Sequence, residues 1–324
     1  MISHASTGKR SPARPSSATV VALLAAFVAA CGTSAAGGDA PPPAVQQRTT
    51  PSAGSHVVVV VMENKEEGRV LGTPGAPFLT RLARRGGVAA ESYGVTHPSL
   101  PNYIALVSGS TQGITDNCTG CTANAPNLAG QLEETGGTWG AYLEGLPRAR
   151  PASVGRYAKK HDPFAYDDAI AASRTRCRRR VPLTRLASDV ARDRLPDFAL
   201  ITPDLCHDTH DCSVRTGDRF LARIVPGLLS ALGPHGFLVV TYDEGDSDRG
   251  CCNGSHGGRI TTVVAGADVR RGAPMARPID HYGVLGSIED ALAVPRLGAG
   301  RDRRHGSLAP LFRGARIPRA RARR

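Results

Sequence analysis

The clearest pattern in the chain is a run of five valines, residues 57–61, that ends abruptly at Met62-Glu63-Asn64. A short, continuous run of β-branched residues is typical of a strand buried on both faces, as in a parallel sheet. A second apolar run, residues 237–242, ends in the same way at Asp243-Glu244. Ligand sites in open α/β sheets lie just outside the carboxyl ends of the strands. We therefore expect the two acidic ends to meet at one edge of a sheet.

The rest of the chain between these runs and after them alternates between predicted helices and predicted strands. The apolar spacing predicts strands at residues 88–95, 198–202 and 259–265, and helices at residues 76–85, 101–108, 127–135, 184–192, 218–232 and 281–293. Strands that alternate with helices favour a mainly parallel sheet covered by helices on both faces. The predicted fold class is therefore α/β.

The N-terminal segment has the pattern of a targeting signal. Three basic residues precede an apolar stretch at residues 19–30, which predicts a signal peptide over residues 1–31. This stretch is too short for a transmembrane span. Val28-Ala29-Ala30-Cys31 resembles a bacterial lipobox, in which the cysteine is lipidated, although an ordinary signal peptide with a chance cysteine is the alternative. We expect export, either secreted or anchored to the cell membrane, with residues 32–54 as a flexible tether.

The net charge of +12 is concentrated at the two ends of the chain. Residues 1–31 contribute +3 and residues 301–324 contribute +8, which leaves only +1 for the body between them. A nearly neutral body argues against a nucleic-acid-binding protein. The Arg-rich segment 301–324 is predicted to be a disordered basic tail, either solvated or in contact with anionic surfaces. Residues 55–300 are long enough for one catalytic α/β domain.

Seven cysteines follow Cys31, and in an exported chain disulfides are the default. We predict two local bridges, Cys118–Cys121 and Cys206–Cys212. A zinc or redox role for the first pair is the alternative, but no second Cys-x-x-Cys pair completes a zinc site. The odd number leaves at least one thiol without a partner in this set. The pairing of Cys177, Cys251 and Cys252 stays open.

The acidic ends of the two strands supply the first candidate chemistry. Glu63, Asn64, Asp243 and Glu244 offer only oxygen ligands, which favour one divalent ion such as Mg²⁺, Mn²⁺ or Ca²⁺ over zinc, without excluding zinc. The alternative is that Glu63 only begins a solvated loop or caps a helix.

A second candidate is Ser99, which lies between a predicted strand and a predicted helix. Pro101 suits the first turn of a helix, so Ser99 lies near a helix N-terminus. The amides and dipole there favour a phosphate group, and a metal or a base can activate the hydroxyl as a nucleophile. Taken alone, Ser99 is better explained as an N-cap, which is the commonest role of serine at such a position.

Six short motifs occur in one order along residues 56–294: Glu63-Asn64, Pro98-Ser99-Leu100-Pro101-Asn102-Tyr103, Lys160-His161-Asp162-Pro163-Phe164, Cys206-His207-Asp208-Thr209-His210-Asp211, Asp243-Glu244 and His256-Gly257-Gly258. This series resembles the bacterial phosphoesterase family of secreted acid phosphatases and phospholipases C, within the alkaline phosphatase superfamily. Two features depart from the family pattern. Asp162 and Asp204 stand where asparagine is usual, and a cysteine usual before the Lys-His motif is missing.

The resemblance implies an alkaline-phosphatase-like fold and a role for each matching residue. Ser99 would be the nucleophile, and one divalent metal would be held by Glu63, Asn64, Asp243 and Glu244. The phosphoryl group would be surrounded by His161, Asp208, His210 and His256, with His207 as a weaker candidate. His97 is a further candidate, with orientation of the nucleophile loop as its alternative role.

The resulting hypothesis is an exported, metal-dependent phosphoric ester hydrolase, most simply a phosphomonoesterase that acts through a phosphoserine. Several histidines could bind the extra oxygens of a monoester dianion, and aromatic residues make up only 5% of the chain, which disfavours a lipid-binding groove. A phospholipase C or other phosphodiesterase is the alternative enzyme. An inactive surface lipoprotein that binds phosphate or metal is the alternative outside enzymes, although Ser99 and Asp243-Glu244 are all present. The expected partners are a small phosphate ester and, through the N-terminus, a membrane; the oligomeric state stays open.

Overall fold

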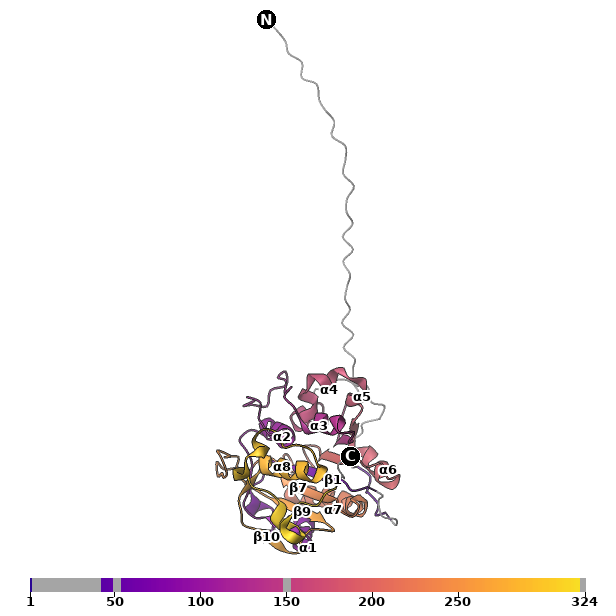
Figure 1. The fold of residues 1–324 in the computed structure, drawn as a ribbon, viewed down its shortest axis with the longest axis vertical. Helices are drawn as coiled ribbons and strands as arrows, with labels where there is room; N and C mark the ends of the chain where they lie inside the picture. Colours follow the sequence, from indigo (N-terminus) through magenta and orange to yellow (C-terminus); the bar gives the residue numbers. More distant parts are fainter. Residues whose placement is uncertain (2–41, 49–53, 148–152, 321–324) are drawn as a thin grey trace.

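The computed structural model describes residue 1 and residues 42–48, 54–147 and 153–320 (Figure 1). The predicted signal peptide with Cys31 and most of the predicted tether lie outside the described residues. Within the described part of the chain, no helix is both long and apolar enough to cross a membrane.

The described residues contain a main sheet of eight strands in the order β10-β2-β9-β7-β1-β6-β4-β5. Every neighbouring pair is parallel except the two pairs that involve β9, which runs antiparallel to β2 and β7. The predicted strands at residues 57–61, 198–202 and 237–242 lie side by side at its centre. The bounds are β1 Val57–Met62, β2 Gly87–Ala89, β4 Trp139–Leu143, β5 Arg180–Pro182, β6 Phe198–Thr202, β7 Phe237–Tyr242, β9 Thr262–Gly266 and β10 Ala273–Met275.

A second, three-stranded sheet corrects two of the predicted strands. It consists of β11 (Ile279–Asp280), β3 (Ser92–Tyr93) and β8 (Arg259–Ile260). The prediction of single strands at residues 88–95 and 259–265 is wrong, because each segment divides between the two sheets. Both halves of each segment are largely buried, so the apolar pattern continues through the point where the chain changes partner.

Helices cover both faces of the main sheet, as the alternation predicted. Val57, Val59 and Val61 belong to a core formed with α2, α3 and α8, whereas Val58 and Val60 belong to a core formed with α1, α6 and α7. Buried positions on both faces explain why β1 reads as a continuous apolar run. The helix bounds are α1 Pro77–Arg85, α2 Ser99–Ser108, α3 Leu128–Glu134, α4 Asp168–Ala172, α5 Arg174–Cys177, α6 Leu186–Ala191, α7 Val214–Ala231 and α8 His281–Leu292.

Two segments predicted to be unstructured pack on the body instead. Val45, from the predicted tether, is buried, and its N–H donates to the Arg223 carbonyl of α7 at 3.1 Å. The prediction of a disordered tail is wrong for residues 301–320, where Leu308, Leu311 and Phe312 are fully buried. The Phe312 ring contacts that of Phe237 on β7, with centroids 5.0 Å apart. The abundant arginines determine the composition of this segment, but the few apolar residues between them determine its packing.

The predicted disulfides Cys118–Cys121 and Cys206–Cys212 are present. The structure also joins the adjacent residues Cys251 and Cys252. None of the described cysteines is a free thiol, and this includes Cys177. The loops that these bridges close lie in the segments between strands, where the candidate site residues also occur.

Candidate active site

The carboxyl ends of β1 and β7 place the two acidic motifs next to each other. The strands are parallel neighbours, with Met62 opposite Tyr242, so Glu63 and Asp243 follow at the same level of the sheet edge. Both side chains are buried, as is Glu244. The Asn64 N–H donates to Asp243 Oδ1 at 3.0 Å, and Asn64 Nδ2 donates to Glu63 Oε2 at 3.0 Å. The side chains of Glu63, Asp243 and Glu244 and the backbone of Asn64 therefore come together at one edge of the sheet, as the strand endings predicted.

Ser99 is the first residue of α2 and its hydroxyl lies against this acidic edge. Ser99 Oγ is 3.1 Å from Glu63 Oε2 and 3.3 Å from Glu244 Oε1, so it can donate to either carboxylate. Lys160 Nζ donates to Ser99 Oγ at 3.1 Å and lies 3.9 Å from Glu63 Oε2. A buried hydroxyl held between carboxylates and an ammonium group is arranged for loss of its proton, because the ammonium stabilises the resulting alkoxide.

The helix start contributes less to an anion site than the sequence suggested. The Leu100 N–H donates to Asn117 Oδ1 at 3.0 Å, and Pro101 has no N–H. Neither backbone group is therefore available to an incoming phosphate. The positive charge beside Ser99 comes from Lys160 instead.

Asn102 holds the loop before Ser99 against α2. Its Oδ1 accepts the N–H groups of Val95 and Thr96 at 2.8 and 3.2 Å, and its Nδ2 donates to the carbonyls of Thr96 and Pro98 at 2.7 and 3.2 Å. All four capacities of this buried amide are used, which fixes the backbone that carries the hydroxyl. Asn102 is thus a positioning residue for Ser99.

His161 lies buried between two carboxylates. Its Nε2 is 3.1 Å from Glu63 Oε1 and its Nδ1 is 3.3 Å from Asp208 Oδ2. Burial alone would lower the pKa of His161, but Glu63 and Asp208 raise it to about 9. Burial alone would raise the pKa of Glu63, but His161 and Lys160 lower it to about 2. Glu63 and Asp208 therefore hold the His161 ring between them, and the Tyr103 ring stacks on it with centroids 5.1 Å apart.

The other predicted histidines lie in three different environments. His210 is exposed, with its ring centroid 6.5 Å from that of His161. His256 is exposed and contacts Thr96, beside the nucleophile loop, at 3.2 Å. His97 donates from Nδ1 to Glu244 Oε2 at 2.6 Å, so it orients a predicted metal ligand.

His207 is held away from Ser99 by its own partners. Its Nδ1 lies 3.0 Å from Glu144 Oε1 and 3.5 Å from Asp204 Oδ1, and its ring stacks on Phe220. Among the described contacts, none joins His207 to Ser99. These contacts fix the start of the segment that carries Asp208, which gives His207 a positioning role.

Comparison with known proteins identifies the family of the chain. The Phosphoesterase family matches residues 73–295. A phosphatidylinositol-3-phosphatase of Mycobacterium tuberculosis is 34% identical over 242 residues, which cover 73% of this chain and 76% of that protein.

The chain belongs to the Phosphoesterase family.

It is accordingly a hydrolase that acts on phosphoric esters. An acid phosphatase of Aspergillus fumigatus is 30% identical over 232 residues, which cover 67% of this phosphoesterase and 51% of the fungal protein. The chain thus spans about half the length of the fungal relative. The lipoteichoic acid synthase LtaP of Listeria monocytogenes superposes with a TM-score of 0.54 at 10% identity, covering 81% of this chain and 79% of that one. The predicted alkaline-phosphatase-like α/β fold is confirmed.

The carboxylate edge of this phosphoesterase has the chemistry of a divalent-metal site. Asp243 Oδ2 is buried without a hydrogen-bond partner. Burial and the nearby charges of Glu63 and Glu244 raise the pKa of Asp243 well above its usual range. Three buried carboxylates with an unpaired oxygen form a donor set for a hard cation, which would compensate their charge.

Two other groups of described residues bring metal-binding side chains within 4.8 Å of one another. They are Glu144, Asp204 and His207, and Cys251, Cys252 and Asp280. In the first group the side chains already pair with one another, and in the second the cysteines are bonded as a disulfide. Among the described residues, Glu63, Asp243 and Glu244 do not form such a group. The unpaired Asp243 oxygen nevertheless favours the predicted set.

Three residues of the site were not identified as functional from the sequence, although all three belong to the quoted motifs. Lys160 contacts the Ser99 hydroxyl, Tyr103 stacks on His161, and Asn102 holds the nucleophile loop. The position of Lys160 directly before the motif histidine His161 could have identified it as a candidate site residue. The positions of Tyr103 and Asn102 one turn into α2 could only be interpreted once the loop and His161 were placed against that helix.

The unusual Asp162 has a structural partner. Its Oδ2 accepts from Arg180 Nε at 2.9 Å and from the Tyr157 hydroxyl at 2.8 Å. Arg180 and Asp162 are both buried, at 3% and 0% exposure. Because Asp162 directly follows His161, this ion pair anchors the Lys160-His161 segment to β5.

We predict that Asp162→Asn lowers the free energy of unfolding by about 3 kcal/mol or more, because it leaves the Arg180 charge buried without compensation. Urea unfolding measures the loss. Asp162→Asn combined with Arg180→Met should recover most of it, since the pair is then neutral. As a control, Asp246→Asn breaks an exposed pair with Arg69 and should change stability by no more than about 0.5 kcal/mol. A single Asp162→Asn variant as stable as this control would contradict the assignment.

Proposed function

We propose that this phosphoesterase is an exported, metal-dependent phosphomonoesterase that acts through a phosphoserine at Ser99. The observation that carries the proposal is the placement of the Ser99 hydroxyl within hydrogen-bond distance of Lys160, Glu63 and Glu244 at the carboxyl edge of the sheet. Nucleophile, proton acceptor and charge-stabilising group are thus in mutual contact, which is the arrangement required for covalent catalysis.

In the first step, Ser99 Oγ attacks phosphorus while its proton passes along a hydrogen bond to Glu244 Oε1, since Glu244 is a stronger base here than Glu63. Lys160 Nζ donates to the oxygen as negative charge develops on it. A divalent cation, when bound, would stabilise the alkoxide and neutralise charge on the phosphoryl oxygens. The bond between phosphorus and the leaving oxygen breaks, and His210, whose exposed ring lies 6.5 Å from that of His161, would protonate that oxygen.

In the second step, water attacks the phosphoserine, the bond from phosphorus to Ser99 Oγ breaks, and phosphate is released. Ser99 Oγ regains its proton from the carboxyl group that was protonated in the first step, and His210 takes the proton that the attacking water loses. Lys160 stabilises the same oxygen as it leaves. The two half-reactions therefore use one set of contacts in opposite directions.

Preference for monoesters is supported by the names of the relatives, a phosphatidylinositol-3-phosphatase and an acid phosphatase. Lys160 supports it as well, because a fixed cation beside Ser99 favours a dianionic monoester over a singly charged diester. The number of histidines does not support a preference for monoesters, since His161 and His207 are engaged by carboxylates.

Hydrolysis of p-nitrophenyl phosphate and of bis(p-nitrophenyl) phosphate tests the proposal directly. We expect a higher kcat/KM for the monoester, and loss of activity on both substrates after chelation, with recovery when a divalent metal is restored. A higher kcat/KM for the diester would assign the chain to the phosphodiesterases, and full activity after verified metal removal would reject metal dependence.

We predict that Lys160→Met lowers kcat about 10²- to 10³-fold, because it removes a donor to the oxygen that gains charge in the transition state. KM should change much less than kcat. Lys160→Arg should retain part of the rate, because it keeps the charge but not its position. Lys65→Met serves as the control, because it removes the same charge. Among the contacts of the described residues, Lys65 Nζ donates only to the Asn64 carbonyl, at 2.9 Å. Equal losses in the two methionine variants would contradict a specific role for Lys160.

Export with lipidation at Cys31 stays a prediction. It is supported by the disulfides of the described body, since such bonds persist mainly in oxidising compartments outside the cytoplasm.

A further inference from the structure

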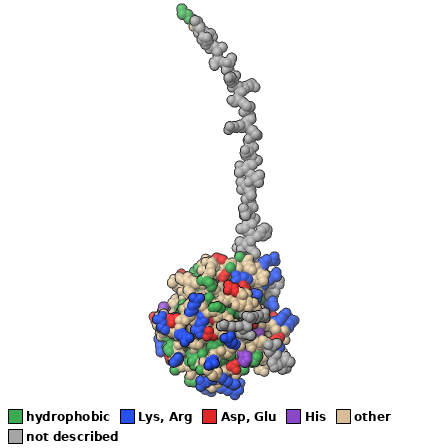
Figure 2. Space-filling view, in the orientation of Figure 1, with side chains coloured by type: hydrophobic (Ala, Val, Ile, Leu, Met, Phe, Trp, Pro, Cys, Tyr) green, Lys and Arg blue, Asp and Glu red, His purple; other side chains and the backbone are tan. Residues whose placement is uncertain are grey.

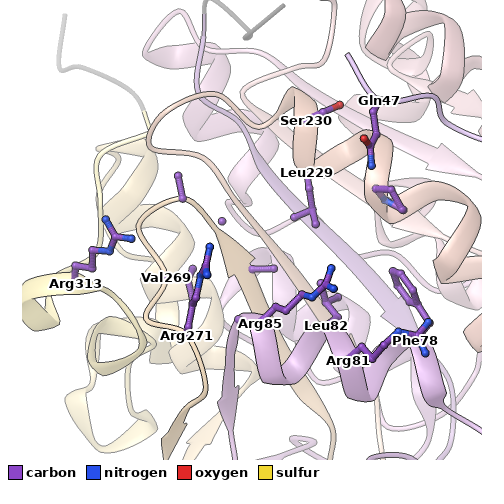
Figure 3. A pocket seen from close by; sticks show the side chains of 15 residues that line it. Gln47, Phe78, Arg81, Leu82, Arg85, Leu229, Ser230, Val269, Arg271 and Arg313 are labelled. Carbon is purple, nitrogen blue, oxygen red and sulfur yellow. The ribbon is translucent and has the colours of Figure 1, made fainter. Parts of the chain in front are cut away.

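A cavity of about 870 Å³ lies at the edge of the main sheet opposite to Ser99 (Figure 3). Ala265 and Gly266 line it, and Gly266 pairs with Phe237, the first residue of β7. Asp243 follows the last residue of the same strand. Six residues of strand therefore separate the cavity from the catalytic carboxylates, a distance of about 20 Å. The cavity is not an extension of the active site.

Four arginines line the cavity: Arg81 and Arg85 from α1, Arg271 from the turn before β10, and Arg313 from the C-terminal segment (Figure 3). No acidic residue is among the lining residues. Within the described part of the chain, none of these guanidinium groups has an ion pair or a side-chain hydrogen bond. Figure 2 shows Lys and Arg side chains gathered over this end of the body, where Figure 1 places α1 and β10.

Such a gathering has an electrostatic cost in the absence of an anion. Arg81 and Arg85 are four residues apart on one helix, where like charges repel each other. Arg271 and Arg313 reach the same cavity from distant parts of the sequence, so this clustering is produced by the fold and not by a run of basic residues. An anion bound among the four would relieve the repulsion.

The same cavity has an apolar side. Phe78 and Leu229 are half-buried in its wall, and Leu82 and Val269 are buried beneath them. Inorganic phosphate alone would leave this surface in contact with water. A ligand that carries both a charged group and a small apolar part would cover it, with a gain proportional to the area removed from water.

We propose that this cavity is a second, non-catalytic site for a phosphate-bearing ligand with two negative charges and an apolar portion. Arginine suits this ligand class, because its planar guanidinium group binds phosphoryl oxygens through paired hydrogen bonds. The ligand is either a free organic phosphate or the phosphate monoester headgroup of a lipid. The site stands on the cavity alone and is independent of the mechanism at Ser99.

Phenylphosphonate is a suitable probe, because it is a dianion with an apolar ring and its carbon–phosphorus bond is not a phosphoric ester. Isothermal titration of the whole protein should show two binding events, one of which is also seen as competitive inhibition of phosphatase activity. Arg81→Gln with Arg85→Gln should raise the Kd of the second, non-inhibitory binding event about tenfold or more, as expected when charge-assisted hydrogen bonds are lost. The inhibition constant and kcat should stay unchanged. Methylphosphonate should bind the cavity more weakly than phenylphosphonate.

Arg84→Gln with Arg277→Gln is the matched control. Both arginines are exposed, neither lines the cavity, and the change in net charge is identical. If phenylphosphonate binding weakens equally in the two double variants, the effect comes from the net positive charge of the protein and the proposal is overturned. A single binding event in the wild type would also overturn it. Arg271→Gln, which changes a different segment, should reproduce the weakening and guards against a local defect in α1.

Sedimentation with phosphatidylcholine vesicles, with and without phosphatidic acid, separates the two sources of the ligand. Binding that requires phosphatidic acid and is lost in the Arg81/Arg85 variant identifies a lipid headgroup. Phenylphosphonate binding without vesicle binding identifies a free organic phosphate. Vesicle binding that the Arg81/Arg85 variant retains in full, together with unchanged phenylphosphonate binding, would reject the site.

Discussion

Ser99→Ala is expected to lower kcat for a phosphate monoester by about three orders of magnitude or more, as removal of a nucleophile does when residual turnover comes from binding and electrostatics alone. The physical reason is the position of the hydroxyl. It is buried at the start of α2, accepts from Lys160 and can donate to either of two carboxylates. Water entering the space left by the side chain would lack the backbone attachment that aligns Ser99 with phosphorus.

Rapid acid quench with a labelled monoester should trap the label on Ser99 in the wild-type protein, and peptide mapping identifies the residue. Ser108→Ala is the matched control, since Ser108 is a buried serine at the other end of α2 whose hydroxyl donates to a backbone carbonyl. This variant should keep both the label and the activity. Near-wild-type turnover by Ser99→Ala, or label on another residue, would end the proposed mechanism.

Asp243→Asn is expected to remove the metal and, with it, most of the activity, by about two orders of magnitude or more. The substitution preserves the shape of the side chain and the oxygen that accepts the Asn64 N–H. It replaces the unpaired, buried Oδ2 by an amide nitrogen, which cannot bind a cation. Elemental analysis of protein purified without chelator should give about one divalent ion per chain for the wild type and a clear deficit for the variant.

Stability provides a readout of the same substitution that does not depend on activity. The wild-type Tm should rise when metal is added, because a ligand that binds only the folded state stabilises it. The Asn variant should show no such rise, and without metal it should be at least as stable as the wild type, since a costly buried carboxylate has been neutralised. Asp246→Asn, an exposed neighbour on the same loop, should behave as wild type. Full metal content in Asp243→Asn would refute the ligand assignment.

Local sequence patterns predicted the centre of the fold because the physics there is local. A run such as residues 57–61 can satisfy its apolar side chains only by burial on both faces, and β1, β6 and β7 form as predicted. The convergence of Glu63 with Asp243 followed from one further rule, that parallel neighbours end at the same sheet edge. The prediction of secondary structure was less accurate for segments whose conformation depends on the elements they pack against. The two divided strands and the packed C-terminal segment are of this kind.

The residue types at the site were visible in the sequence, but their roles depended on contacts between distant segments. His161 and His207 lie in equivalent-looking motifs, yet the first is enclosed by Glu63 and Asp208 and the second is paired with Glu144. No local rule specifies which carboxylate reaches which imidazole, because each partner is supplied by a different strand end. Lys160 likewise became a candidate only when the fold placed its ammonium group on the Ser99 hydroxyl.

Local patterns along the chain predicted the α/β class, the central strands, two disulfides and the set of chemical groups at the carboxyl edge. The tertiary structure alone decided which of those groups touch Ser99, and it alone gathered Arg81, Arg85, Arg271 and Arg313 around one cavity. The physical reason is the range of the interactions. Backbone preference and strand burial depend on neighbours along the chain, whereas hydrogen bonds and ion pairs depend on a few ångströms between segments that only the folded core brings together.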